Sequence, residues 1–349
     1  MMGTRFLEVD DVDAAHLAEL LDRAQRWKRD PARVPRSLEG LGVAVLFEKP
    51  SARTRVSTEM AVVSLGGHPV HLRGEDVGLG VRETVEDVAR TLAGYCAVIA
   101  ARVHDHAVLE TMAASVDVPV VNLLSDRAHP LQALADALTL RECLGSLEGR
   151  RLAFVGDGNN VASSLAFVAA LSGLELTVSS PPGYELDVDV VDRARNLGGQ
   201  IELVADPFEA VRGADAVYTD VWTSMGQEEE ADARRVAFEG HQVNEELLAA
   251  AGPKAVFLHC LPAHRGRRWR RPSSTDPRRG SGSRPPTGWT PRGCSSPTSS
   301  NGLREPWPPS GSPSASTGSS GSSRSRRSPA RPSSWSCWPP TAWWPPRRR

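Results

Sequence analysis

The sequence predicts an α/β protein with two doubly wound domains of parallel sheet, an interdomain cleft and a disordered C-terminal tail. Three observations favour this fold class. Short β-branched strands without polar–apolar alternation are separated by amphipathic helical stretches up to about residue 266, which is typical of parallel sheets covered on both faces. This strand–helix pattern occurs twice, and the composition then changes abruptly. We expect domains over residues 1–140 and 141–266, followed by a tail over 267–349.

Strands and helices alternate along the first 266 residues. The predicted strands are Gly42–Phe47, Ala97–Ala101, Val118–Asn122, Leu152–Val155, Glu175–Val178, Ile201–Val204, Ala216–Tyr218 and Ala255–His259. The clearest helical patterns are Ala14–Lys28, Val85–Leu92, Leu131–Leu144 and Val161–Leu171. The long helix Leu131–Leu144 lies between the two repeats, so we expect it to bridge two domains that enclose a ligand cleft.

The last 83 residues differ in kind from the rest. Residues 267–349 hold 16 Arg, no Lys, two acidic residues, seven of the nine Trp and one Leu, among many Ser, Pro and Gly. So few apolar side chains cannot offset the entropy of ordering, which predicts disorder. Because Arg, Pro, Gly, Ser and Trp can all be encoded by GC-rich codons, we interpret this tail as out-of-frame translation. A real Ser/Arg-rich interaction tail, best represented by Ser323–Ser328, is the alternative.

Charge and composition exclude several classes of protein. The tail carries 14 positive charges and residues 1–266 carry 15 negative ones, which gives the net charge of -1. An acidic body argues against nucleic acid as a partner. The sequence contains no run of 18 apolar residues, so we predict no membrane span. Met1–Asp10 contains no apolar core of a signal peptide. The five cysteines include no CxxC pair, which predicts no zinc site and favours a reducing, cytoplasmic location.

The first motif is Phe47-Glu-Lys-Pro-Ser-Ala-Arg-Thr-Arg55, where a strand ends and a helix begins near Arg53. Ser51 and Thr54 can cap the first turn of this helix. A helix N-terminus with hydroxyls and two arginines is a suitable cradle for phosphate. An ordinary capped helix with solvated arginines is the alternative, which the spacing alone favours.

The second motif, His129-Pro-Leu-Gln132, opens the predicted bridging helix. His129 and Gln132 are three residues apart and face the same side of it. Both can donate a hydrogen bond to a carbonyl oxygen, as the polarisation of an acyl group requires. A histidine that caps the helix beside a structural proline is about equally consistent with the pattern.

The third motif is the glycine turn Val155-Gly-Asp-Gly-Asn-Asn160. A dinucleotide-binding turn requires an acidic residue at the end of the next strand. Here the next strand, Glu175–Val178, runs into Ser179-Ser180-Pro181, so we predict no nicotinamide cofactor. We interpret Asn159 and Asn160 as amide side chains directed into the cleft, with turn-forming asparagines as the alternative.

The fourth motif, Asp220-Val-Trp-Thr-Ser-Met-Gly226, follows the predicted strand Ala216–Tyr218. Open α/β sheets bind ligands at the carboxyl ends of their strands. We therefore expect Asp220 to bind a substrate ammonium group, and an N-cap acid is the alternative.

The fifth motif, Phe257-Leu-His-Cys-Leu-Pro-Ala-His-Arg265, ends an apolar strand at the same edge. Cys260 is a candidate for a reactive thiol or a polarisable wall of the site. The alternative is an inert core cysteine, which is the more common role.

Together these motifs resemble those of the aspartate and ornithine carbamoyltransferases. The first resembles the Ser-Thr-Arg-Thr-Arg signature of that family, and the second resembles its His-Pro-x-Gln motif. The fourth and fifth resemble the Asp-x-x-x-Ser-Met-Gly and His-Cys-Leu-Pro motifs that separate the ornithine branch from the aspartate branch. The resemblance runs from about Arg5 to Gly266 and is highly specific as a set.

The resemblance implies transfer of the carbamoyl group of carbamoyl phosphate to the δ-amine of L-ornithine, which gives L-citrulline and phosphate. It implies no metal and no organic cofactor. The residues expected to bind carbamoyl phosphate are Ser51, Ala52, Arg53, Thr54, Arg102, His129, Gln132, Cys260 and Leu261. Those expected to bind ornithine are Asn160, Asp220, Ser224 and Met225. The expected catalytic residues are Arg102, His129, Gln132 and Cys260.

The resemblance also implies a cytoplasmic homotrimer of arginine biosynthesis, with sites between subunits. Two alternatives remain open for the function. One is a sister transcarbamylase that uses another amine, such as putrescine, and the other is a non-catalytic binding protein with a Ser/Arg-rich tail.

The chain departs from the family pattern in three places. Ala52 stands where the family has Thr, and Gly78 lies in a stretch, Gly74–Arg82, where the family often has a polar residue. That stretch resembles the loop that a neighbouring subunit lends to the site. After Gly266, neither the family's further phosphate-binding Arg nor its closing helix is recognisable. We therefore expect the chain as written to have little or no activity.

Overall fold

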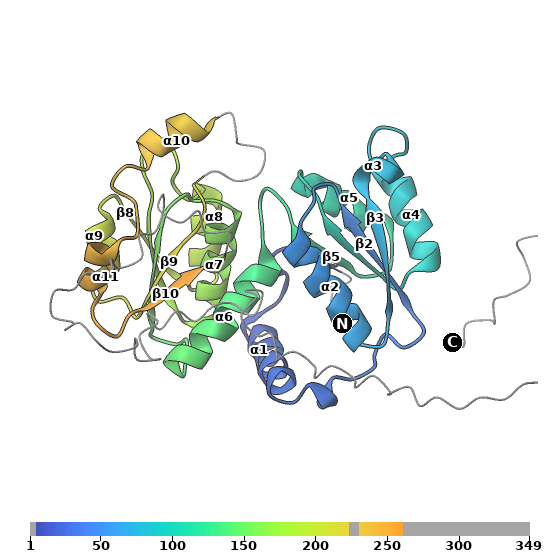
Figure 1. The fold of residues 1–349 in the computed structure, drawn as a ribbon, viewed down its shortest axis with the longest axis horizontal. Coiled ribbons are helices and arrows are strands. Elements are labelled where there is room, and N and C mark those ends of the chain that lie inside the picture. Colours follow the sequence, from blue (N-terminus) through green and yellow to red (C-terminus); the bar gives the residue numbers. More distant parts are fainter. Residues whose placement is uncertain (1–4, 223–229, 261–349) are drawn as a thin grey trace, which may run out of the picture. The chain divides into compact units, whose positions relative to one another are not determined.

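The computed structural model describes residues 5–222 and 230–260. These residues form two α/β domains, each built on a five-stranded parallel sheet with helices packed against it (Figure 1). The predicted fold class of two doubly wound parallel-sheet domains with a cleft is thus confirmed. The predicted disorder of residues 267–349 falls outside the described residues.

The first domain contains the sheet with strand order β1-β5-β4-β2-β3. Its strands are β1 (Arg5–Phe6), β2 (Gly42–Phe47), β3 (His68–Arg73), β4 (Val98–Arg102) and β5 (Val120–Leu124). The helices in this part of the chain are α1 (Ala14–Arg29), α2 (Ala52–Ser64), α3 (Gly74–Val77), α4 (Val85–Tyr95) and α5 (His106–Ser115), with short 3-10 turns at Val9–Asp11 and Pro31–Arg33. From Val43 to Phe47 every side chain of β2 is buried, because helices cover both faces of this central strand.

The second domain contains the sheet with strand order β10-β9-β6-β7-β8. Its strands are β6 (Arg151–Val155), β7 (Glu175–Ser179), β8 (Gln200–Val204), β9 (Ala216–Thr219) and β10 (Val256–His259). The helices are α6 (Pro130–Leu144), α7 (Asn160–Ser172), α8 (Val188–Asn196), α9 (Pro207–Val211), α10 (Ala231–Ala237) and α11 (Glu245–Ala251). Nine consecutive residues of α7, from Val161 to Ala169, are buried, so this helix lies in the centre of the domain.

Each sheet has one point where the order of its strands reverses. In the first sheet the chain proceeds from β2 to β3 on one side and from β4 to β5 on the other; in the second, β7 and β8 lie on one side of β6, while β9 and β10 lie on the other. Ligands of open α/β sheets bind at the carboxyl ends of the strands that flank such a point. The fold therefore predicts two binding regions, one beyond β2 and β4 and one beyond β6 and β9.

Helix α6 packs into the cores of both domains. Leu131 packs against the first-domain core, which includes Val45 and Phe47. Ala137 and Leu140 belong to the second-domain core together with residues of α7. Leu17 and Leu21 of α1 also pack into this second core, although α1 precedes the first sheet in the sequence. The domain limits at residues 140 and 266 remain predictions.

Eight of the ten strands were predicted from the sequence, with bounds that agree to within two residues. The exceptions are β1 and β3, for which no strand was expected. Both lie at the edges of the first sheet, where one side of a strand has no partner.

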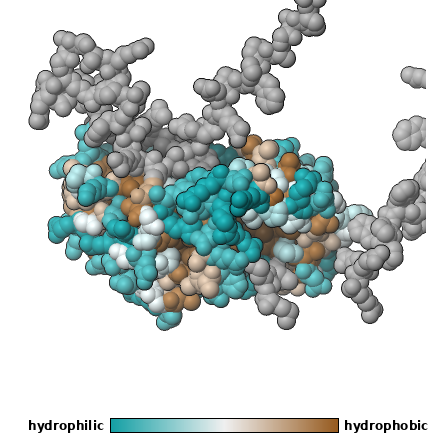
Figure 2. All heavy atoms as spheres, turned by 90° about the horizontal axis from the view of Figure 1, so that it is seen from below, coloured by the Kyte–Doolittle hydropathy of each residue, from teal (hydrophilic) through white to brown (hydrophobic). Residues whose placement is uncertain are grey.

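The described surface combines a mostly hydrophilic exterior with smaller hydrophobic patches on the face drawn in Figure 2. Within the described ranges, 5–222 and 230–260, no helix has the length and apolar character that a membrane crossing requires.

Candidate active site

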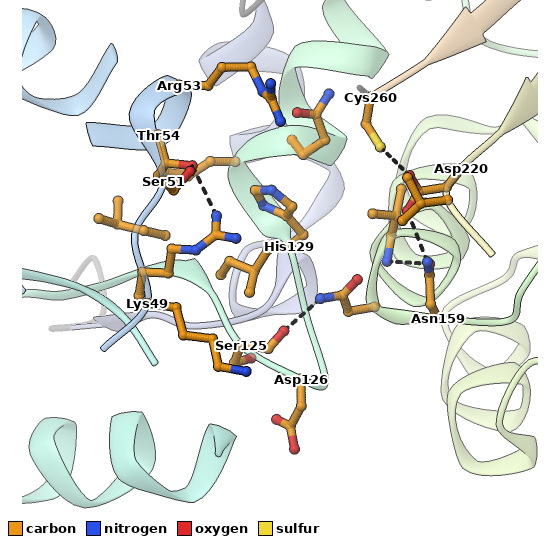
Figure 3. Close-up of a pocket in the computed structure, with 18 of the residues that line it drawn as sticks. Lys49, Ser51, Arg53, Thr54, Ser125, Asp126, His129, Asn159, Asp220 and Cys260 are labelled. Carbon is orange, nitrogen blue, oxygen red and sulfur yellow. Dashed lines mark hydrogen bonds between the residues drawn. The ribbon is translucent and has the colours of Figure 1, made fainter. Parts of the chain in front are cut away.

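A cavity of about 640 Å³ lies at the carboxyl ends of both sheets. The first domain and the start of α6 supply one part of its lining, which includes Ser51, Arg53, Thr54, Arg102, His129 and Gln132. The second domain supplies Asp157, Asn159, Asn160, Asp220, Arg234 and Cys260. Both strand-order reversals thus contribute to one cavity, which Figure 3 shows from within.

The first end of the cavity is built from the start of α2 and the end of β4. Ser51 is the N-cap residue of α2, but its side chain does not cap the helix, contrary to the expected role. Instead, Ser51 Oγ donates to Thr54 Oγ1 at 3.0 Å, and Arg102 Nη1 donates to the same oxygen at 3.0 Å (Figure 3). The two hydroxyls therefore link the helix terminus to an arginine from a neighbouring strand.

Positive charge is left uncompensated at this end. Arg102 is 6% exposed, and burial together with the nearby Arg53 lowers its pKa to about 10. It therefore still carries its charge at neutral pH. Among the described residues, no carboxylate forms an ion pair with Arg53 or Arg102, and the buried Nε of Arg102 has no hydrogen-bond partner. Two unpaired guanidinium groups beside a helix N-terminus are suited to a multiply charged anion.

His129 lies beside these arginines at the start of α6. Its backbone N–H donates to Ser164 Oγ at 2.9 Å, and its side chain does not cap the helix, so the capping alternative is wrong. Burial and the positive charge of Arg102 lower the pKa of His129 to about 3. The imidazole is therefore neutral at physiological pH and can donate a hydrogen bond from only one of its ring nitrogens.

Gln132 lies one turn further along α6 and is directed by a buried carboxylate. Its Nε2 donates to Asp136 Oδ1 at 3.0 Å, and Asp136 is 1% exposed. One amide hydrogen is thus used within the protein. The expected donation from Gln132 to a substrate carbonyl has to come from its other amide hydrogen, and it remains a prediction.

The opposite end of the cavity contains a buried carboxylate. Asp220 is 4% exposed; its Oδ2 accepts from Asn159 Nδ2 at 2.9 Å and its Oδ1 accepts from Cys260 Sγ at 2.7 Å (Figure 3). The next described helix after Asp220 is α10, which begins only at Ala231, so nothing described supports the N-cap alternative. No described Lys or Arg forms an ion pair with Asp220. A buried acid of this kind is suited to an ammonium ligand.

Cys260 lines this end of the cavity and also packs against the second-domain core, so it is suited to a wall of the site and not to a reactive thiol. Burial and the neighbouring Asp220 raise its pKa well above the usual value. Asp220, His259 and Cys260 offer the only group of three potential metal-ligand atoms found in the described part of the chain, all within 4.8 Å of one another. Within this group Cys260 Sγ donates a hydrogen bond to Asp220 Oδ1.

Comparison with known proteins agrees with this division of the cavity. Residues 4–142 match the carbamoyl-P binding domain of the aspartate/ornithine carbamoyltransferases, and residues 148–276 match their Asp/Orn binding domain. The chain belongs to the aspartate/ornithine carbamoyltransferase family.

The similar carbamoyltransferases cover most of the chain. It is 53% identical over 274 residues to an ornithine carbamoyltransferase from Acidothermus cellulolyticus, which covers 76% of this chain and 86% of that protein. It is 54% identical over 250 residues to one from Thermus thermophilus, which covers 72% of this chain and 81% of that protein.

Solved carbamoyltransferase structures are similar as well. The ornithine carbamoyltransferase from Thermus thermophilus superimposes with a TM-score of 0.70 at 48% identity, covering 77% of this chain and 89% of that one. The one from Pyrococcus furiosus gives a TM-score of 0.74 at 43% identity, covering 79% and 90%.

In this carbamoyltransferase the glycine turn after β6 positions side chains on the second-domain side of the cavity. Asn159 caps α7 through bonds from the N–H groups of Val161 and Ala162, and it also donates to Asp220. Both proposed roles of this asparagine, turn-forming and cleft-facing, are therefore present. Gly158 is required by packing, because a Cβ there would lie 2.3 Å from the backbone nitrogen of Leu186.

Asn160 also lines the cavity, but its side chain is engaged with the first domain. Its Nδ2 donates to the carbonyl oxygen of Ser125 at 2.6 Å. The expected contact of Asn160 with ornithine therefore remains a prediction. The expected site residues Ser224, Met225 and Leu261 lie outside the described residues.

Several cavity residues of this carbamoyltransferase were not expected from the sequence. Lys49 lies within the first motif, where its charge was the available signal, and its side chain lines the cavity (Figure 3). Arg234 donates to Asp157 Oδ2 at 2.7 Å, and both residues are buried in the lining of the acceptor side. Arg234 follows the fourth motif by eight residues, and nothing in its local pattern distinguishes it from a surface arginine of α10.

Proposed function

We propose that this carbamoyltransferase transfers the carbamoyl group of carbamoyl phosphate to the δ-amine of L-ornithine. The observation that carries the proposal is the separation of charge within one cavity. Arg53 and Arg102, which form no ion pair with a described carboxylate, line one part, and the buried Asp220, which forms no ion pair with a described Lys or Arg, lines another. A dianionic donor and an amino-acid acceptor with an α-ammonium group would meet this pattern, and the names of the similar proteins support the same pair of substrates.

The mechanism follows from the protonation states in the cavity. The δ-amine, after losing its proton, attacks the carbamoyl carbon, and negative charge grows on the carbonyl oxygen. Arg102, the neutral imidazole of His129 and the side-chain amide of Gln132 would donate hydrogen bonds to that oxygen. The bond between carbon and the phosphate oxygen then breaks, the attacking nitrogen gives its second proton to the departing phosphate, and phosphate leaves towards Arg53, Ser51 and Thr54. Holding both substrates side by side would supply a large part of the rate.

Acceptor choice tests this function directly. Whatever activity the purified chain has with carbamoyl phosphate is expected to favour ornithine over putrescine, because putrescine offers Asp220 an ammonium group but lacks the α-carboxylate of ornithine. Calorimetric titration with each amine provides a readout that does not require turnover. Equal or tighter binding of putrescine, with faster turnover, would identify the chain as a sister transcarbamylase.

We also propose that the chain is a cytoplasmic homotrimer that acts in arginine biosynthesis. An apolar stripe on α2 supports the assembly: Val56, Met60 and Val63 are 59%, 56% and 50% exposed and fall on one face of the helix. Val81, in the stretch that resembles a loop lent to a neighbouring site, is 94% exposed. Apolar side chains gathered in this way favour an interface between copies of the chain.

Charging this stripe should dissociate the assembly. The double variant Val56→Asp, Met60→Lys is expected to elute as a monomer in size-exclusion chromatography with light scattering, while the parent elutes as a trimer. The matched control is Val188→Asp, an exposed valine of α8 in the second domain, which should leave the trimer intact. A parent chain that is itself monomeric, or a charged variant that stays trimeric, would disprove this interface.

A further inference from the structure

A buried chain of hydrogen bonds crosses the protein behind the cavity. Gln132 Nε2 donates to Asp136 Oδ1 at 3.0 Å, and the hydroxyl of Tyr218 donates to Asp136 Oδ2 at 2.8 Å. Tyr218 lies on β9, so the carboxylate of Asp136 joins the bridging helix to the second sheet. Neither Asp136 nor Tyr218 lines the cavity, and the mechanism above uses neither.

This carboxylate has no compensating charge nearby. Asp136 is 1% exposed and Tyr218 is 0% exposed. No described Lys, Arg or His forms an ion pair with Asp136. The titratable groups that face it are Tyr218 of β9, Asp220 directly after β9 and Cys260 directly after β10, and the charge of Asp220 opposes its ionisation. The two hydrogen-bond donors, Gln132 and Tyr218, are therefore what favours the ionised form.

We propose that Asp136 and Tyr218 form a positioning pair, in which ionised Asp136 fixes the direction of the Gln132 amide at the carbamoyl group and Tyr218 keeps Asp136 ionised. The proposal rests on the proposed function, because it assigns Gln132 to the carbonyl end of carbamoyl phosphate. Asp136 acts through Gln132 and does not touch substrate.

The ionisation of Asp136 fixes the direction of the hydrogen bonds that it forms with Gln132 and Tyr218. An ionised carboxylate can only accept, so the nitrogen end of the Gln132 amide has to face Asp136 and the hydroxyl hydrogen of Tyr218 has to point to it. A protonated Asp136 becomes a donor at one oxygen. The carboxyl group can then also donate to the oxygen of the Gln132 amide, so it no longer requires the nitrogen end of that amide to face it.

This switch falls at an experimentally accessible pH. Burial raises the pKa of Asp136 to about 7, while the bonds from Tyr218 and Gln132 lower it. The ionised, directing form is therefore lost as the pH falls through about 7. His129 cannot be the origin of such a change, because its pKa is about 3.

The test measures binding, so it does not depend on turnover. The probe is phosphonoacetamide, which carries a phosphonate, a carbonyl and an amide, and the reference probe is methylphosphonate, which lacks the last two. Calorimetry between pH 5.5 and 8.5 gives the affinity ratio of the two probes. In the parent this ratio should fall about tenfold as the pH drops through about 7, the ionisation range of Asp136.

Three variants separate positioning from a structural role. Asp136→Asn should abolish the pH-dependent step, and Tyr218→Phe, which keeps the ring stacked on Phe154, should move its midpoint up by about one pH unit. The control is Thr139→Val, a buried polar residue one turn along α6, which should leave the profile unchanged.

The outcomes distinguish this pair from the proposed function. The positioning pair would be overturned by any of three results. The affinity ratio of the parent could show no pH-dependent step, the step could persist in Asp136→Asn, or its midpoint could move in Thr139→Val as much as in Tyr218→Phe. Tighter binding of putrescine than of ornithine would overturn the proposed function, while the binding profile would still decide the role of Asp136.

Discussion

Replacing Arg53 with alanine should weaken the binding of carbamoyl phosphate roughly 30-fold, or about 2 kcal/mol, which is within the range of a hydrogen bond to a charged group. Arg53 forms no ion pair with a described carboxylate, so its truncation removes a contact to the anion without breaking one inside the protein. Because Arg53 is exposed to the cavity, the fold should be unaffected. Calorimetric titration with carbamoyl phosphate measures the effect, and the affinity for ornithine should change little.

The neighbouring Arg55 provides the matched control. It belongs to the same helix, but it pairs with Glu59 at 2.8 Å and does not line the cavity. Arg55→Ala should therefore leave carbamoyl phosphate binding within about twofold, since exposed ion pairs on a helix contribute little. If both variants weakened binding equally, the general positive charge of α2 would be responsible and not a cradle at its first turn.

Replacing Asp220 with alanine should raise the Michaelis constant for ornithine about 100-fold and leave that for carbamoyl phosphate nearly unchanged. Asp220 is 4% exposed and faces no described cation, so a bound ammonium group would be its main counter-charge. A charge-assisted bond in such an environment contributes about 1.5–3 kcal/mol. Initial rates of citrulline formation at varied concentrations of each substrate measure the two constants.

The isosteric variant Asp220→Asn separates charge from shape. It keeps an oxygen that can accept from Cys260 or Asn159, so it should fold as the parent does, yet it should bind ornithine nearly as poorly as Asp220→Ala. Should the two constants rise together in either variant, the assignment of one substrate to each domain would be wrong.

Much of the fold could be predicted because its central strands are buried on both faces. The predicted bounds of β2 match the observed ones. Its sequence, Gly-Val-Ala-Val-Leu-Phe, is an uninterrupted apolar run, which is typical of a central strand covered on both faces. β3, His-Pro-Val-His-Leu-Arg, contains two histidines and a proline and is only partly buried at the sheet edge. β1 has only two residues. Edge strands carry no such apolar signal, so periodicity could not identify them.

The sequence predicted those cavity-lining residues that belong to short motifs. His129 and Asp220 stand at the start of a helix and the end of a strand, where ligands often bind, whereas Arg102 was expected only from the family resemblance. The contacts behind them could not be predicted, because they join distant segments. Tyr218 meets Asp136 across 82 positions of sequence and Arg234 meets Asp157 across 77, and no local spacing encodes such a pairing.

Helix α6 limits how this enzyme could be recombined with its relatives. Leu131 packs in one core and Ala137 in the other, and the same helix lines the cavity through Gln132 and contacts β9 through Asp136. A chimera whose junction lies between β5 and α6 would combine α6 of one parent with the first-domain core of the other. A junction in the loop after Leu144 would separate Ala137 and Leu140 of α6 from the second core, and Asp136 from Tyr218. An exchange of second domains to obtain new amine specificities should therefore keep α6 and Tyr218 from the same parent.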